Sequence, residues 1–213
     1  MNSSQNSIFK YENISHSDLN SLERSKTVVF VCVGPLEEHG THLPLGTDAL
    51  IARYLAEELA ARLIAQPDFS EHKFLFMPTL FVGVDTLKYI GSIEVQAEYI
   101  RGILINTCAQ LAKDGFKTII FVGSHGGPRH IVLLEEVASW LRWRYRTKSI
   151  SVSSKALMKV LDGKIVRKIV ERLSQDEKLS SENVQNLSKA LGSDFHAGAI
   201  ETSLMLIFNP ELV

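Results

Sequence analysis

The sequence predicts a three-layer α/β/α sandwich with a mostly parallel sheet. Short apolar runs rich in β-branched residues alternate with longer segments of helical periodicity, which is typical of parallel β-α-β units. Loops rich in glycine and histidine follow two of the predicted strands, at the end of a sheet where such folds bind ligands. We expect one domain over residues 1–213, with a core at about 27–213 and an N-terminal extension over 1–26.

The first predicted elements are two strands and the helix between them. Thr27–Gly34 (TVVFVCVG) is apolar throughout, which indicates a strand buried on both faces. Thr47 or Asp48 caps the following helix, and residues 73–81 form a second strand that Pro78 weakens. The helix is predicted to bury a stripe of apolar residues at four-residue steps. These are Ile51, Leu55, Leu59 and Leu63.

The second half continues the alternation. A helix is predicted from Ser92 to Gly115, a buried strand over 118–123, and a helix that Pro128 opens and that runs to about 146. A fourth strand is expected over 149–152. Residues 162–194 are polar with weak helical periodicity, which favours solvated surface helices; a flap over the site is the alternative.

Composition restricts the classes of function. The hydrophobic fraction of 45% and the charged fraction of 22% are those of a globular domain, so a metal would serve catalysis rather than hold the fold together. A net charge of −1 predicts no nucleic-acid partner. The N-terminus is polar and no apolar run is long enough to span a membrane, so a cytoplasmic location is expected without membrane contact. Cys32 and Cys108 are expected to be reduced core residues.

Five of the seven histidines fall in three short segments beside glycines and carboxylates. In the first segment, Glu37 and His39 point to the same side of an extended chain. Asp48 begins a helix, where a carboxylate stays ionised, and its two oxygens could bridge two cations. Oxygen and nitrogen ligands of this kind suit Zn²⁺, Mn²⁺ or Fe²⁺. Spacing alone equally allows a loop with polar caps and a hydrogen-bonded histidine.

The other two segments are weaker signals when each is taken alone. His125 follows a buried strand and precedes two glycines, which allow close approach of a ligand; a plain glycine-rich turn is the alternative. His196 could donate or accept a proton near neutral pH. Glu201 lies in a first helical turn, where an anion is favoured, so a capping role is its alternative. His130 fits a surface or oligomer contact as well as it fits a site residue.

Together the three segments resemble the creatininase (creatinine amidohydrolase) family. The motifs GPLEEHGTHLPLGTD, VGSHGGP and HAGAIETS occur in the family's order, and the resemblance runs from about Val28 to Val213. It implies a creatininase-like fold, a pair of divalent ions and a homo-oligomer such as a hexamer. The resemblance assigns one ion to Glu37, Asp48 and His125, the second to His39, Asp48 and Glu201, and proton transfer to His196.

The resemblance also implies the reaction, which is hydrolysis of a C–N amide bond in a small molecule by a metal-activated water. Family precedents include opening of a cyclic amide, deformylation of a formamide and trimming of a peptide end. Creatininase itself has a glutamate ligand where this chain has Gly127.

The chain departs from the family pattern at positions that spare the proposed ligands. Pro35, Glu38, Gly123 and Pro128 replace family residues, and the region before Asp194 is shorter than usual. These departures motivate the alternative of a catalytically inactive metal-binding or scaffold protein. A nucleotide-binding domain is excluded because the first strand-to-helix turn has neither Gly-x-Gly-x-x-Gly nor a Walker lysine.

Overall fold

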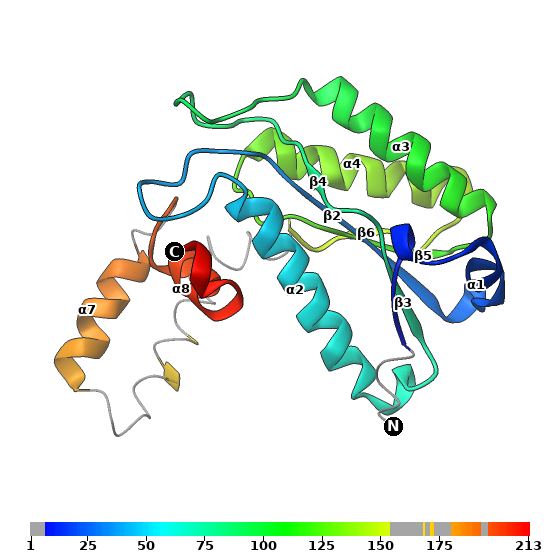
Figure 1. The fold of residues 1–213 in the computed structure, drawn as a ribbon, viewed down its shortest axis with the longest axis horizontal. Coiled ribbons are helices and arrows are strands. Elements are labelled where there is room, and N and C mark those ends of the chain that lie inside the picture. Colours follow the sequence, from blue (N-terminus) through cyan, green and yellow to red (C-terminus); the bar gives the residue numbers. More distant parts are fainter. Residues whose placement is uncertain (1–6, 154–167, 169–170, 173–179, 193–195) are drawn as a thin grey trace.

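The computed structural model describes residues 7–153, 168, 171–172, 180–192 and 196–213 (Figure 1). Its centre is a six-stranded sheet. Five strands follow the order β1-β3-β2-β5-β6, and the short β4 pairs with the C-terminal end of β2. Every strand pair is parallel. The predicted α/β fold with a parallel sheet is therefore confirmed. The strands are β1 (Ile8–Lys10), β2 (Thr27–Gly34), β3 (Lys73–Phe76), β4 (Leu80–Phe81), β5 (Thr118–Val122) and β6 (Ile150–Ser151).

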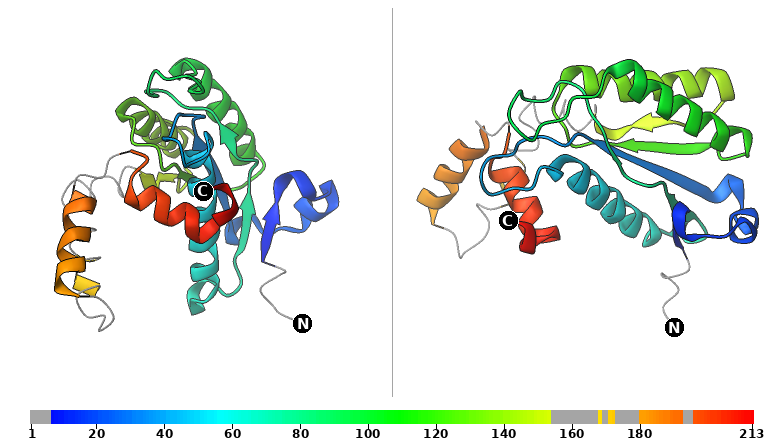
Figure 2. Two further views of the ribbon diagram at one scale, coloured as in Figure 1. Left: turned by 60° about the vertical axis from the view of Figure 1, so that its left-hand side comes forward. Right: turned by 45° about the horizontal axis from the view of Figure 1, so that its top comes forward.

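Helices cover both faces of the sheet (Figures 1 and 2). Helices α3 (Ala97–Lys113) and α4 (Pro128–Tyr145) lie on one face, and α2 (Thr47–Ile64) lies on the other. Successive side chains of β2 alternate between the two cores, because a strand points its side chains to opposite faces. Val29, Val31 and Val33 join the core under α3 and α4, whereas Val28, Phe30 and Cys32 join the core under α2.

The face of α2 that contacts the sheet differs from the predicted one. Leu55 is 39% exposed, and Leu59 and Leu63 only pack against the edge of the core. The residues that are fully buried under the helix are small, which lets the helix backbone approach the sheet. They are Ala52, Ala56 and Ala60.

Three further element boundaries differ from the sequence prediction. The expected strand over 73–81 is divided into β3 and β4, which flank Pro78 and pair with opposite halves of β2. Helix α3 begins at Ala97 rather than Ser92. The N-terminal residues belong to the sheet, since β1 pairs with β3 and Leu22 is buried in the core, so the core does not start at 27.

The C-terminal helix packs beside α2. Helix α8 (Ala199–Phe208) contributes Met205 to a small apolar cluster with Leu43 and Ile51, and Phe208 stacks on Tyr54 with ring centroids 4.6 Å apart. The proposed flap over 162–194 lies largely outside the described residues, which include α7 (Ser181–Gly192) and a few residues before it. Within the described part of the chain, no helix is long and apolar enough to cross a bilayer.

Candidate metal centre

The predicted ligands meet at the carboxyl ends of the central strands. Glu37 and His39 lie in the loop after β2, His125 follows β5, Asp48 is the second residue of α2, and Glu201 lies in the first turn of α8. Their donor atoms form two overlapping groups that share Asp48, and in each group the atoms lie within 4.8 Å of one another. Distant parts of the chain therefore converge on one small volume.

The first group consists of Glu37, Asp48 and His125, all buried. The Nδ1 atom of His125 lies 3.0 Å from Glu37 Oε2 and 3.1 Å from Asp48 Oδ2. Its other ring nitrogen, Nε2, lies 3.1 Å from the carbonyl oxygen of Val84. Because a carbonyl only accepts, Nε2 carries a proton and Nδ1 is left to face the carboxylates. This arrangement is how proteins fix the orientation of a ligating histidine.

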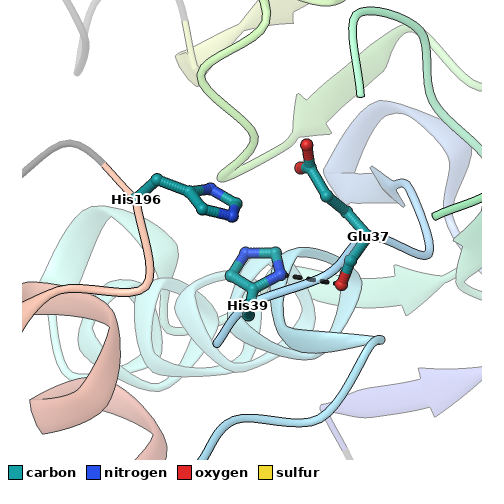
Figure 3. Close-up of side chains that lie close together, drawn as sticks. All are labelled: Glu37, His39 and His196. Carbon is teal, nitrogen blue, oxygen red and sulfur yellow. Dashed lines mark hydrogen bonds between the residues drawn. The ribbon is translucent and has the colours of Figure 1, made fainter. Parts of the chain in front are cut away.

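The second group consists of His39, Asp48 and Glu201. His39 Nε2 lies 3.8 Å from Asp48 Oδ1 and 3.9 Å from Glu201 Oε2. His39 Nδ1 donates to the carbonyl oxygen of Glu37 at 2.9 Å, so Nε2 is the free ring nitrogen here (Figure 3). Asp48 presents one carboxylate oxygen to each group, which is the geometry of a bridging ligand.

The donor atoms fit divalent cations. Glu37 Oε2, His39 Nε2 and Asp48 Oδ2 are buried and make no hydrogen bond among the described residues. Buried polar atoms without a partner are rare because their desolvation is uncompensated. Ligands about 2.0–2.2 Å from a shared Zn²⁺ would stand roughly 3–4 Å apart, as these atoms do. The mixed carboxylate and imidazole set suits Zn²⁺, Mn²⁺ or Fe²⁺.

The electrostatics of the centre favour positive charge. Burial lowers the pKa of His125, but the carboxylates of Asp48 and Glu37 outweigh burial and raise it to about 10. Burial likewise opposes the charged form of His39, whose pKa Asp48 raises to about 9. Burial raises the pKa of Asp48, yet the two imidazoles hold it far below its usual range. Burial and the Asp48 carboxylate raise the pKa of Glu201. A proton or a metal ion can satisfy this excess of negative charge.

His196 lies beside His39 and on the same side as the Glu37 carboxylate, as Figure 3 shows. Its ring centroid is 4.3 Å from that of His39, and its Nε2 lies 2.6 Å from the carbonyl oxygen of Glu38. One ring nitrogen also groups with the donor atoms of Glu37 and His39. His196 is half-buried, so its ring reaches both the centre and solvent.

Glu201 is placed for both of the roles that its position in the sequence allowed, capping a helix and binding a metal ion. Its Oε2 accepts a hydrogen bond from the backbone N–H of Ala197 at 2.6 Å, just before α8, as a capping carboxylate would. The same oxygen faces His39. Ala197 has a positive φ of 50°, and this bond fixes the turn that carries His196.

Three glycines allow the convergence. A Cβ on Gly34 would lie 2.6 Å from the backbone nitrogen of Ala49, so the start of α2 can reach the end of β2 only with glycine there. A Cβ on Gly127 would lie 2.5 Å from His125 Nε2. This chain therefore has no room for a side chain at Gly127, where the family resemblance suggested a glutamate ligand, and Glu201 is the carboxylate that completes the second group. Gly123 is also crowded, with a Cβ 3.0 Å from the carbonyl oxygen of Val33.

Two features were missed by sequence reasoning. His130 is fully buried, not a surface or oligomer contact, and its ring meets that of His125 edge to face at 5.3 Å. Burial and the charge of His125 lower its pKa to about 4, so it is neutral. The loop after β4 also contacts the centre, because the backbone N–H of Leu87 donates to Glu37 Oε1 at 2.5 Å. Neither feature has a motif that would reveal it.

Comparison with solved structures agrees with the fold. A proposed creatinine amidohydrolase from Bacteroides fragilis NCTC 9343 aligns with a TM-score of 0.68 and 20% identity, covering all of this chain and 71% of that protein. The structure designated Creatininase Mn aligns with a TM-score of 0.64 and 19% identity, covering 96% and 74%. A mutant creatininase of the Zn-Zn type gives 0.61 and 18%, with the same coverage.

Curated relatives carry a different name. A mycofactocin precursor peptide peptidase of Mycobacterium ulcerans (strain Agy99) is 25% identical over 187 residues, which are 87% of this chain and 60% of that protein. The Mycobacterium tuberculosis H37Rv protein of the same name is 29% identical over 102 residues, 46% of this chain and 40% of that protein. The chain thus spans about 60% of the M. ulcerans relative. The family profile for creatininase, creatinine amidohydrolase, matches residues 12–213, and the chain belongs to the creatininase family.

Proposed function

We propose that the chain is a hydrolase that cleaves the C–N amide bond of a small molecule at a centre of two divalent ions. The observation that carries the proposal is the convergence of five donor residues on two groups that share Asp48. Glu37 and His125 would hold one ion with Asp48, and His39 and Glu201 would hold the other. Membership of the creatininase family supports the reaction class.

The chain's own residues supply orientation and proton transfer. When bound, the two ions would supply a water of lowered pKa and polarise the substrate carbonyl. His196 Nδ1 would take a proton from this water as the water oxygen bonds to the carbonyl carbon, and would pass that proton to the leaving nitrogen as the C–N bond breaks. The bond from His196 Nε2 to the Glu38 carbonyl fixes the ring for this role. The products are a carboxylic acid and an amine.

Metal removal and reconstitution test the proposal. The purified protein, stripped with a chelator, should bind two equivalents of Zn²⁺ or Mn²⁺ and regain hydrolysis of a member of a panel of cyclic amides, formamides and short peptides. Glu37→Gln should lose high-affinity binding of one ion. The matched control is Glu38→Gln: within the described residues the Glu38 carboxylate accepts from the backbone N–H of Gly40, and its backbone carbonyl is unchanged by the substitution. Activity that survives exhaustive chelation would refute the proposal.

Trimming of a peptide end is the second candidate. The curated relatives are named as peptidases of a precursor peptide, and two exposed apolar residues are joined to Glu37 through their backbones. Leu87 is 40% exposed and Leu45 is 43% exposed; their backbones bond to Glu37. They could contact apolar residues of a peptide. Release of a terminal fragment from apolar peptides, with no turnover of small amides, would select this candidate.

The same experiment also tests the alternative that the chain binds metal but is catalytically inactive. Two ions bound at full occupancy, with no turnover across the whole panel, would favour it. A cytoplasmic location and a homo-oligomer stay predictions.

A further inference from the structure

The loop after β4 holds one side of the metal centre through two hydrogen bonds. The carbonyl oxygen of Val84 accepts from His125 Nε2 at 3.1 Å, and the backbone N–H of Leu87 donates to Glu37 Oε1 at 2.5 Å. Residues 84–87 therefore contact both ligands that, with Asp48, make up the first group. A shift of this loop would turn the imidazole and the carboxylate together.

Asp85, in the middle of this loop, has a positive φ of 65°, a conformation that residues other than glycine rarely adopt. Its carboxylate is bound by the start of α4. Helix α4 has no side-chain cap of its own on Gly127, and Pro128 has no N–H, so Arg129 provides the first free backbone donor. That N–H donates to Asp85 Oδ2 at 2.7 Å, and the Nε of Arg129 pairs with Asp85 Oδ1. Asp85 thus caps α4 from another part of the chain.

The contact between the two loops is close as well as charged. A Cβ on Gly127 would lie 2.8 Å from the Cβ of Asp85, so the loops touch without an intervening side chain. Burial raises the pKa of Asp85, but the hydrogen bonds from Arg129 outweigh burial and keep it below its usual range. The Nη2 atom of Arg129 donates to Glu94 Oε1 at 3.0 Å. The carboxylate of Asp85 is therefore held on the side facing α4.

We propose that Asp85 is a positioning residue, which fixes residues 84–87 against the start of α4 and so orients His125 and Glu37 for the metal. The proposal rests on the proposed function, because it presumes that these two side chains bind an ion. Groups that hold metal ligands in place commonly contribute about 10- to 100-fold to metal affinity. The carboxylate is required for two reasons: it accepts two hydrogen bonds at once, and its charge complements the N-terminus of a helix.

Metal affinity of two variants tests the role. Asp85→Ala removes both hydrogen bonds and should weaken binding of the ion at the first group by about 10- to 100-fold, measured for Zn²⁺ by competition with a chromophoric chelator. Asp85→Asn retains a residue that tolerates positive φ and should lose about tenfold, because an amide cannot accept both bonds through oxygen. The absorption spectrum of the Co²⁺-loaded protein should change in both variants, since it reports ligand geometry rather than stability.

The control is Glu136→Gln, which removes the charge from a different arginine–carboxylate pair, between α3 and α4, with Arg101 Nη2 2.7 Å from Glu136 Oε2 on the exposed side. It should bind Zn²⁺ as the wild type does and give the wild-type Co²⁺ spectrum. If Asp85→Ala does not fold, Asp85→Asn decides. An Asn variant with wild-type affinity and spectrum would overturn the positioning role alone, whereas a wild-type protein that binds no metal would overturn the proposed function as well.

Discussion

Metal binding should release protons, because the two site histidines hold them tightly in the metal-free protein. The pKa values of about 10 for His125 and about 9 for His39 mean that both imidazoles are protonated at pH 7. Each must lose the proton on the nitrogen that faces the carboxylates before it can bind a cation. Two ions should therefore displace about two protons, and the product of the two binding constants should rise about 100-fold per pH unit up to roughly pH 9.

Titration calorimetry at pH 7 in buffers of different ionisation enthalpy measures the number of protons released. His125→Gln should reduce the count by about one, whereas His16→Gln, an exposed histidine on α1 (His16–Ser21), should leave it at about two. Chelator competition between pH 6.5 and 8 gives the slope independently. Proton release near zero, or an affinity that does not vary with pH, would refute the assignment of the two imidazoles as ligands that replace a proton with a metal.

Three further outcomes follow from the packing and charge of the centre. Met205→Ala, at a fully buried position, should weaken the packing of α8 by about 2–5 kcal/mol and so lower the affinity for the ion bound by His39, Asp48 and Glu201. Metal titration should then show one tight and one weak site, and two tight sites would contradict this. Gly34→Ala should lower the free energy of unfolding in urea by about 1–3 kcal/mol and should lower metal affinity, because the added Cβ displaces the start of α2. No change in either quantity would mean that the close approach of α2 to the end of β2 is unnecessary. The metal-free protein should lose stability as pH rises from 6.5 through 10, because the raised pKa values of His39 and His125 stabilise the fold fully only below the histidine pKa of the unfolded state. Thermal unfolding without metal measures the direction of this change. A melting temperature that rises over the interval would contradict it.

The residue pattern along the chain predicted the central strand β2 correctly, but it predicted the neighbouring elements less well. The apolar run of β2 predicted a doubly buried strand because both of its faces need cover, and that requirement is visible in the residues themselves. The predicted apolar stripe of α2 was only partly right: Ile51 is buried, but the side chains that face the sheet are the smaller Ala52, Ala56 and Ala60, which allow close approach of the helix. The N-terminal strand was missed because three residues carry too little periodicity to be recognised.

The sequence by itself determined the fold class and the residues that could bind metal, since hydrophobic alternation and clustered histidines are local properties of the chain. Only the tertiary structure decided which carboxylates and imidazoles share a centre, because contacts between β2, β5, α2 and α8 join segments far apart in sequence. It also placed Asp85 against the start of α4 and His130 against the ring of His125. Their neighbours come from other loops, and no spacing along the chain records a contact that folding alone creates.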